Sequence, residues 1–125
     1  MKVYCNLTGY PSKFPRWAAG FWQSKLRYES QDEILEVARE YKRRGIPIDA
    51  IVIDYFHWTE QGEWKFDPKY WPDPKAMVDE LNEMGIKLIV SIWPTINPKS
   101  ENYHQMSEAN MLVRTENGQY GIFDF

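Results

Sequence analysis

The chain has 125 residues, which is the length of one domain and enough to bury a hydrophobic core. Its net charge of −3 argues against binding to nucleic acids or to anionic membranes. The single cysteine, Cys5, excludes an internal disulfide, and no apolar run reaches the length of a membrane span. No signal peptide is recognisable, so we take the cytoplasm as the default location.

Aromatic side chains make up 16% of the sequence and include six tryptophans. Most aromatic residues of a domain belong to its core, and we expect the same here. Six tryptophans also suit sugar binding, because the C–H faces of a pyranose stack on indole rings, although this argument is weak by itself. Catalysis by Cys5 is not expected, since the two histidines form no recognisable triad pattern.

The first fifteen residues are rich in types that favour turns: Gly9, Pro11, Ser12 and Pro15. They predict a linker or irregular lead-in at 1–15, followed by one domain at 16–125. A first short strand is predicted at 17–23, where two tryptophans and a phenylalanine lie close together.

A helix is predicted between Ser30 and Gly45. Ser30 and Glu33 have the spacing of a capping box, in which each side chain satisfies a backbone N–H of the other residue. The apolar residues of this segment recur at helical spacing and define one buried face: Ile34, Leu35, Val37, Ala38 and Tyr41. Gly45 supplies the stop.

The chain is organised around residues 46–58, which contain the unbroken apolar run 50–53. A run of this kind is typical of a strand that is buried on both faces. Asp54 follows it directly. Since α/β proteins bind their ligands at the carboxyl ends of parallel strands, the position of Asp54 predicts a binding site at this edge.

A second helix is predicted after Asp73, which suits the N-cap, and Pro74, which suits the first helical position. Gly85 ends this helix, and a third strand is predicted at 86–92. The buried stripe of this second helix contains the following residues: Met77, Val78, Leu81 and Met84. The order β-α-β-α-β, with right-handed crossovers, predicts parallel strands and places the chain in the α/β class.

The last quarter of the chain is predicted to hold two small elements. A short helix is expected at 101–109. A hairpin is expected at 112–123, because Asn117 and Gly118 form the dipeptide that favours a tight turn.

Several short motifs follow one another along nearly the whole chain. They are Leu7-Thr8-Gly9, Pro15-Arg16-Trp17-Ala18, residues 20–25, Asp54, Trp64-Lys65-Phe66-Asp67, residues 71–74, residues 85–88 and Ile92-Trp93-Pro94. This series resembles glycoside hydrolase family 31, the family of α-xylosidases and α-glucosidases, with the bacterial α-xylosidases as the nearest branch. Motifs in one order at compatible spacing are far more specific than any single motif.

The resemblance implies a (β/α)8 TIM barrel, of which this chain supplies about the first three βα units plus the C-terminal hairpin. It also implies retaining hydrolysis by two aspartates about 5–5.5 Å apart. The family's nucleophile follows the fourth strand, and no position of this sequence matches either catalytic aspartate. We therefore assign no catalytic residue, and we expect the chain alone to be inert towards α-linked xylose- or glucose-containing saccharides.

The resemblance also implies a role for Asp54, because the aspartate that ends the second strand binds hydroxyls of the sugar in the family's cleavage subsite. Trp93 ends the third strand and is predicted to form a wall of the same pocket. Phe56 and Trp58 are further candidates for its lining, and Trp22 is a candidate for either the site or the barrel interior. For Asp54, a loop cap or a partner for a buried arginine is the structural alternative.

Other polar residues have a plainer interpretation. His57 lies in an aromatic loop and is predicted to be a hydrogen-bonded structural residue rather than a general base. Asp67 and Asp73, each before a proline, are predicted to be turn and cap residues. No pattern of Cys, His, Asp or Glu suits zinc or calcium, and no glycine-rich phosphate loop occurs, so no cofactor or metal is expected.

Two functional alternatives remain open. One is a non-catalytic sugar-binding module that uses Asp54, Trp93 and the neighbouring aromatic residues. The other is a barrel fragment that pairs with copies of itself, or with the remainder of the barrel, because a three-stranded piece leaves two sheet edges open. A synthetic half-barrel is a variant of the second hypothesis. Xylose and glucose differ by one hydroxymethyl group, and the sequence does not decide between them.

Overall fold

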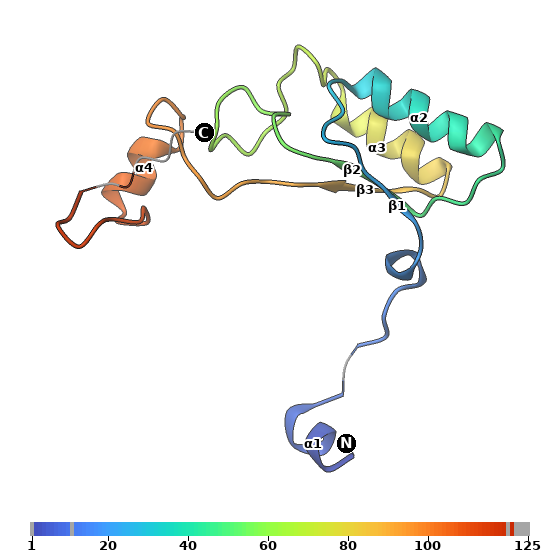
Figure 1. Ribbon diagram of the computed structural model, residues 1–125, viewed down its shortest axis with the longest axis horizontal. Helices are drawn as coiled ribbons and strands as arrows, with labels where there is room; N and C mark the ends of the chain where they lie inside the picture. The colour runs from blue at the N-terminus through green and yellow to red at the C-terminus, as the bar shows by residue number, and fades with distance from the viewer. Residues whose placement is uncertain (1, 11, 120, 122–125) are drawn as a thin grey trace.

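The computed structural model describes residues 2–10, 12–119 and 121. Its centre is a parallel sheet of three strands in the order β1-β2-β3. The strands are β1 (Trp22–Gln23), β2 (Ala50–Ile53) and β3 (Lys87–Val90). Two helices, α2 (Gln31–Arg43) and α3 (Pro74–Glu83), lie side by side on one face of this sheet (Figure 1). The predicted β-α-β-α-β order and parallel strands are confirmed.

Helix α2 begins where the capping signal predicts. The side chain of Ser30 accepts a hydrogen bond from the Glu33 N–H at 3.3 Å. The reciprocal bond is shifted by one residue, because the Glu33 carboxylate accepts from the N–H of Glu29 at 2.8 Å and also pairs with Lys25. Ser30 therefore caps the helix as expected, while Glu33 fixes the preceding loop to it.

Helices α2 and α3 end in the same way. The N–H groups of Gly45 and Ile46 donate to carbonyls of the last turn of α2, at 3.0 Å each. Gly85 and Ile86 repeat this arrangement at the end of α3, at 2.9 and 2.8 Å. Both glycines have positive φ, as the Schellman motif requires. At its start, α3 is capped by Asp73, as predicted.

The hydrophobic core lies between the sheet and the two helices. Ile51 and Ile53 of β2 point into it, together with Leu88 and Val90 of β3. The helices contribute these buried side chains: Ile34, Leu35, Ala38, Met77 and Leu81. The opposite face of the sheet carries Val52, which pairs in register with Ile89, and both are only partly buried. One face of the sheet is therefore packed and the other is open.

The N-terminal quarter differs from the sequence-based expectation in two places. The segment from Trp17 begins with a 3-10 helix, η1 (Arg16–Ala19), and the strand is confined to Trp22–Gln23. The carboxylate of Asp49 lies over Gly20, where an added Cβ would be 1.9 Å from Oδ2, so the chain turns closely there before the strand begins. The lead-in is also not wholly irregular, since it contains α1 (Lys2–Thr8), which has no buried residue.

The C-terminal part lies beyond the carboxyl end of β3 (Figure 1). The predicted third helix is present as α4 (Tyr103–Glu108). A turn follows, in which Thr115 N–H donates to the Gln119 carbonyl at 2.7 Å. Most of the second arm of the predicted hairpin falls on residues 120 and 122–123, outside the described residues. Among the described helices, none has the length and apolar character needed to cross a bilayer.

Candidate functional site

Strands β2 and β3 end side by side and bring Asp54 next to the loop that carries Trp93. The N–H of Ser91 donates to the carbonyl of Ile53 at 2.9 Å, which extends the strand pairing by one residue. Asp54 is half-buried, and its Oδ1 accepts from the Tyr55 N–H at 2.9 Å. Within the described part of the chain no cation pairs with this carboxylate. The alternative of a partner for a buried arginine is therefore not supported there.

Trp93 lies against three aromatic rings of the β2 loop, which we define as residues 54–73. Its ring stacks on Tyr55, with centroids 5.4 Å apart and planes 10° from parallel. The rings of Phe56 and Trp58 are each 6.2 Å from it and tilted. Three of the four predicted aromatic candidates therefore meet at the carboxyl ends of the strands. We call the rings of Tyr55, Phe56, Trp58 and Trp93 the aromatic wall.

Phe56 has an unusual backbone. Its φ of +59° lies in the left-handed region, which a bulky residue adopts only when its surroundings impose it. Half of its surface is exposed, and the guanidinium of Arg27 lies 5.8 Å from its ring centroid. A cavity of about 150 Å³ opens beside this pair; its lining residues are Arg27, Glu29, Phe56, Trp58, Asp67 and Tyr70.

His57 is buried behind the aromatic wall. Its ring packs against Trp58 and Phe66, at centroid distances of 4.7 and 5.2 Å, and its Nδ1 is 3.3 Å from the carbonyl oxygen of Asp54. Burial lowers the pKa of His57 below its ordinary value, which favours the neutral imidazole. This environment fits the structural interpretation of His57.

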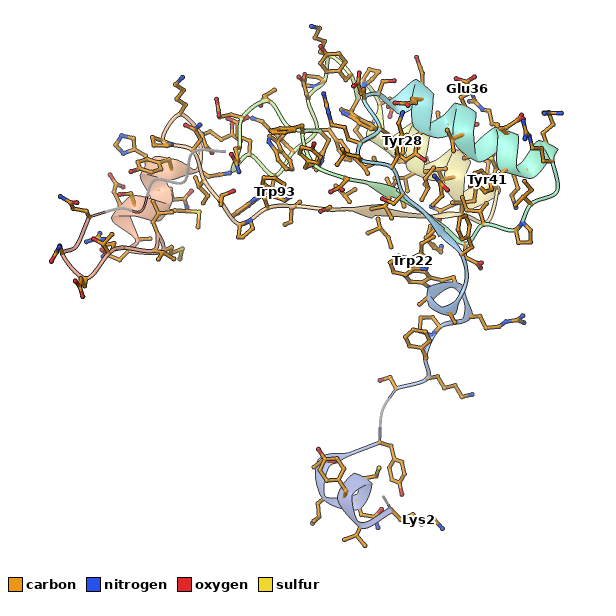
Figure 2. The ribbon with its side chains drawn as sticks, in the orientation of Figure 1. Lys2, Trp22, Tyr28, Glu36, Tyr41 and Trp93 are labelled. Atoms are coloured by element: carbon orange, nitrogen blue, oxygen red, sulfur yellow. The ribbon has the colours of Figure 1, made fainter. Side chains whose placement is uncertain are left out.

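Trp22 lies apart from Trp93 (Figure 2). It pairs in register with Ala50, at the start of β2, whereas Asp54 follows the end of that strand. At about 3.3 Å per residue, the four intervening steps amount to roughly 13 Å. The indole stacks on Trp17, at a centroid distance of 5.7 Å, and donates to the Trp17 carbonyl at 3.3 Å. Its position on the open sheet face favours the barrel-interior alternative.

Tyr55 and Arg27 belong to this region but are absent from the sequence-based candidates. Tyr55 directly follows Asp54, so its place in the aromatic run was the available signal. No sequence motif points to Arg27, because the contact of its guanidinium with the Phe56 ring depends on how two loops fold together. Asp67 is a turn residue, as predicted, because its Oδ1 accepts from the Lys69 N–H at 2.9 Å.

The arrangement at the strand ends suits binding of a polyhydroxylated ring. A carboxylate can accept hydrogen bonds from neighbouring hydroxyls, and aromatic faces can cover C–H groups. Among the described residues no group of three or more His, Cys, Asp or Glu side chains could hold a metal ion. A larger cavity of about 430 Å³ lies along α2, away from the strand ends, and is lined by Glu36, Val37, Glu40, Tyr41, Arg44 and Ile46.

Comparison with protein families gives a match over most of the chain. The family described as glycosyl hydrolases family 31, TIM-barrel domain, matches residues 11–124. Among solved structures, an α-xylosidase from a soil metagenome, in complex with xylose, is 60% identical with a TM-score of 0.85. The match covers 89% of this chain and 16% of that one.

Two relatives show the same partial coverage. A family 31 glucosidase of Pseudescherichia vulneris is 50% identical over 124 residues, which is 99% of this chain and 23% of that protein. An α-xylosidase of Saccharolobus solfataricus is 44% identical over 115 residues, which is 90% of this chain and 16% of that protein. The chain thus spans less than a quarter of the length of these relatives.

Proposed function

Because the chain belongs to glycoside hydrolase family 31, we propose that it forms part of the sugar-binding subsite of a retaining α-glycosidase, either an α-xylosidase or an α-glucosidase. The predicted fold class is confirmed, since the chain matches the family's TIM-barrel domain and has the parallel α/β arrangement of a partial barrel. The observation that carries the proposal is the half-buried carboxylate of Asp54, which pairs with no cation in the described part of the chain and lies beside the aromatic wall.

The chemistry of this pair of features supports a saccharide ligand. A charged carboxylate accepts a hydroxyl hydrogen bond about twice as strong as a neutral acceptor does. Trp93 and Phe56 offer aromatic faces for the less polar side of the ring. A relative of known structure was crystallised with xylose, and other relatives are α-xylosidases and glucosidases. In our proposal Asp54 accepts hydrogen bonds from the sugar hydroxyls, and the aromatic wall packs against the less polar face of the sugar ring.

The open face of the sheet supports placement in a larger barrel. Trp22 is 41% exposed there, and Val52 and Ile89 are only partly buried. We propose that further barrel strands cover this face in the parent enzyme. Association of two copies of the 125-residue chain would cover it too, and light scattering over a range of concentrations separates a monomer from a self-associated form.

The experiment that tests the sugar subsite is a xylose titration of the ¹⁵N-labelled chain, followed through its indole signals. We expect the Trp93 and Trp58 indole signals to shift with xylose at millimolar concentration, while the Trp22 signal stays in place. In Asp54→Asn, which keeps the shape and removes the charge, we expect these shifts to disappear.

Asp79→Asn is the matched control, because Asp79 is an exposed carboxylate on α3 whose recorded partner is Lys75. It should respond to xylose like the unaltered chain. If the chain is folded and its indole signals shift with neither xylose nor glucose, the proposal that these residues form a sugar subsite is refuted.

A further inference from the structure

Polar contacts join the β2 loop to the loop that follows β3, which we define as the β3 loop (residues 91–102). Gln61 contributes two of them: its carbonyl accepts from the Asn97 N–H at 2.9 Å, and its side chain contacts the Thr95 hydroxyl. The Asn102 side chain donates to the Gly62 carbonyl at 2.7 Å. The two loops therefore share one set of hydrogen bonds.

The carboxylate of Glu63 is at the centre of these contacts. The residue is only 8% exposed, which is rare for a glutamate and requires partners. Its Oε2 accepts from the Thr59 hydroxyl within the β2 loop, and its Oε1 accepts from the Glu101 N–H of the β3 loop at 3.3 Å. Lys65 Nζ is 3.6 Å from Oε2 and also contacts the Glu101 carboxylate at 2.5 Å.

The backbones of the two loops also approach closely next to Glu63. A Cβ built on Gly62 would lie 2.8 Å from the Cα of Ile96, so only glycine fits there. Gly62 also has a φ of +97°, which side chains rarely adopt. This close approach is independent of the carboxylate and shows that the loops meet along their main chains.

The same junction reaches the aromatic wall through the residue after Glu63. The indole N–H of Trp64 donates to the carbonyl of Trp93 at 3.2 Å. Trp93 in turn stacks on Tyr55 at the start of the β2 loop. A shift of the 59–65 segment would therefore move the carbonyl of Trp93, and with it the ring that faces the predicted sugar.

We propose that Glu63 is a positioning residue, which sets the aromatic wall at Trp93 by joining the β2 and β3 loops. This inference rests on the proposed function, in which Trp93 faces the sugar. Glu63 does not touch the sugar in this scheme. It holds the Glu101 N–H and the Thr59 hydroxyl, and thereby fixes the distance between the loops on which the wall depends.

The test compares Glu63→Ala and Glu63→Gln with the unaltered chain in ¹H–¹⁵N spectra with assigned indole signals. Glu63→Ala leaves the Glu101 N–H without its acceptor, and we expect the Trp64 and Trp93 indole signals to shift before any sugar is added. We expect the affinity for xylose to fall about tenfold. Amide signals of Ile51 and Ile53 in β2 verify that the sheet stays folded.

Glu63→Gln tests geometry apart from charge. Its amide oxygen can accept from the Glu101 N–H, and its amide nitrogen can donate to the Thr59 hydroxyl oxygen. We therefore expect near-normal indole signals and most of the xylose affinity. Because glutamine also keeps the volume of glutamate, rescue by Glu63→Gln shows that the contacts of the side chain, and not its charge, position the wall.

Glu36→Ala is the matched control, because it removes an exposed carboxylate of α2 and leaves the contacts between the two loops in place. Indole signals and affinity should stay unchanged. Unmoved Trp64 and Trp93 signals in Glu63→Ala, or an equal effect in Glu36→Ala, would overturn the inference. If the indole signals of the unaltered chain do not change with xylose, the proposed function is refuted. The Trp64 and Trp93 indole signals measured without sugar still decide whether Glu63 sets the position of Trp93.

Acid provides a second arm of the test. The hydrogen bond from Thr59 holds the pKa of the Glu63 carboxyl below its ordinary value, with smaller contributions from the Glu101 N–H and from Lys65. The junction is therefore intact above the ordinary pKa and weakens as the pH falls through the lowered one. The Trp64 indole signal should move in that acid range in the unaltered chain and not in Glu63→Gln.

Discussion

The ring of Tyr55 stacks on the ring of Trp93 at a centroid distance of 5.4 Å, with the planes 10° from parallel. Tyr55 is the second residue after β2, and Trp93 is the third after β3. Parallel strands place their carboxyl ends at one edge, so two residues 38 positions apart in sequence come into contact. The aromatic wall is therefore formed entirely by residues of this chain, between the carboxyl ends of the neighbouring strands β2 and β3.

Replacement of Tyr55 tests how far this stack holds the wall in place. Tyr55→Ala removes the ring, and we expect xylose affinity to fall between about two- and tenfold, because such an aromatic pair contributes about 0.5–1.5 kcal/mol. Tyr55→Phe keeps the ring and should bind like the unaltered chain. A titration followed by the Trp93 indole signal measures both. Equal binding by the two variants would contradict a role for the stack.

Phe56 allows binding and stability to be separated. Its left-handed φ of +59° costs an L-residue about 1–2 kcal/mol, and glycine avoids this cost. Phe56→Gly and Phe56→Ala both lose the half-exposed ring, and both should bind xylose more weakly. We expect Phe56→Gly to be the more stable of the two by about 1 kcal/mol in urea unfolding. The opposite order would show that the backbone strain is absent in solution.

Gly85 tests the end of α3. Apart from its chain neighbours, no atom of the described residues lies within 4 Å of a Cβ added there. Gly85→Ala therefore creates no clash, and its cost comes from the φ of +73°. We expect the free energy of unfolding to fall by about 1–2 kcal/mol. Gly85→Asn should lose less, because asparagine tolerates the left-handed conformation. Thermal unfolding followed by circular dichroism compares the three chains, and equal midpoints would refute the argument.

Local signals explain what the sequence predicts well. Ser30 and Asp73 cap the two helices, and Gly45 and Gly85 end them, because caps and stops depend on residues within one turn. The apolar run 50–53 becomes the central strand for a similar reason. The strand expected from Trp17 begins only at Trp22, because Pro15 and Gly20 enclose a 3-10 helix. The prediction gave the aromatic residues of this segment more weight than the two turn-forming residues.

The site is only partly predictable, since its parts meet through tertiary structure. The order of strands places Asp54 and Trp93 at one edge, and this follows from sequence alone. The contact of Arg27 with Phe56, and the carboxylate of Glu63 between two loops, depend on loop conformations that no short motif encodes. Trp22 points to the open face because strand periodicity fixes its side, whereas its distance from Asp54 depends on the register with Ala50.

An ion pair joins α2 to α3 and gives a prediction for pH. Arg39 donates to both carboxylate oxygens of Glu80, at 2.6 and 2.8 Å. The hydrogen bond from Arg39 lowers the pKa of Glu80 below its ordinary value of 4.5. Because the pKa in the folded state is depressed, the pair stabilises the fold fully above the ordinary pKa. Its contribution is lost as the pH falls through the lowered value.

Glu80→Gln should therefore lower the urea midpoint at pH 7, and the difference from the unaltered chain should shrink progressively below pH 4.5. The effect should be small and should weaken with salt, since the Arg39 side chain is 57% exposed and screened by water. Glu83→Gln, on the same helix, removes an exposed carboxylate that has no recorded ion pair among the described residues. A pH-independent difference, or one that Glu83→Gln reproduces, would show that the Arg39 pair does not link the helices.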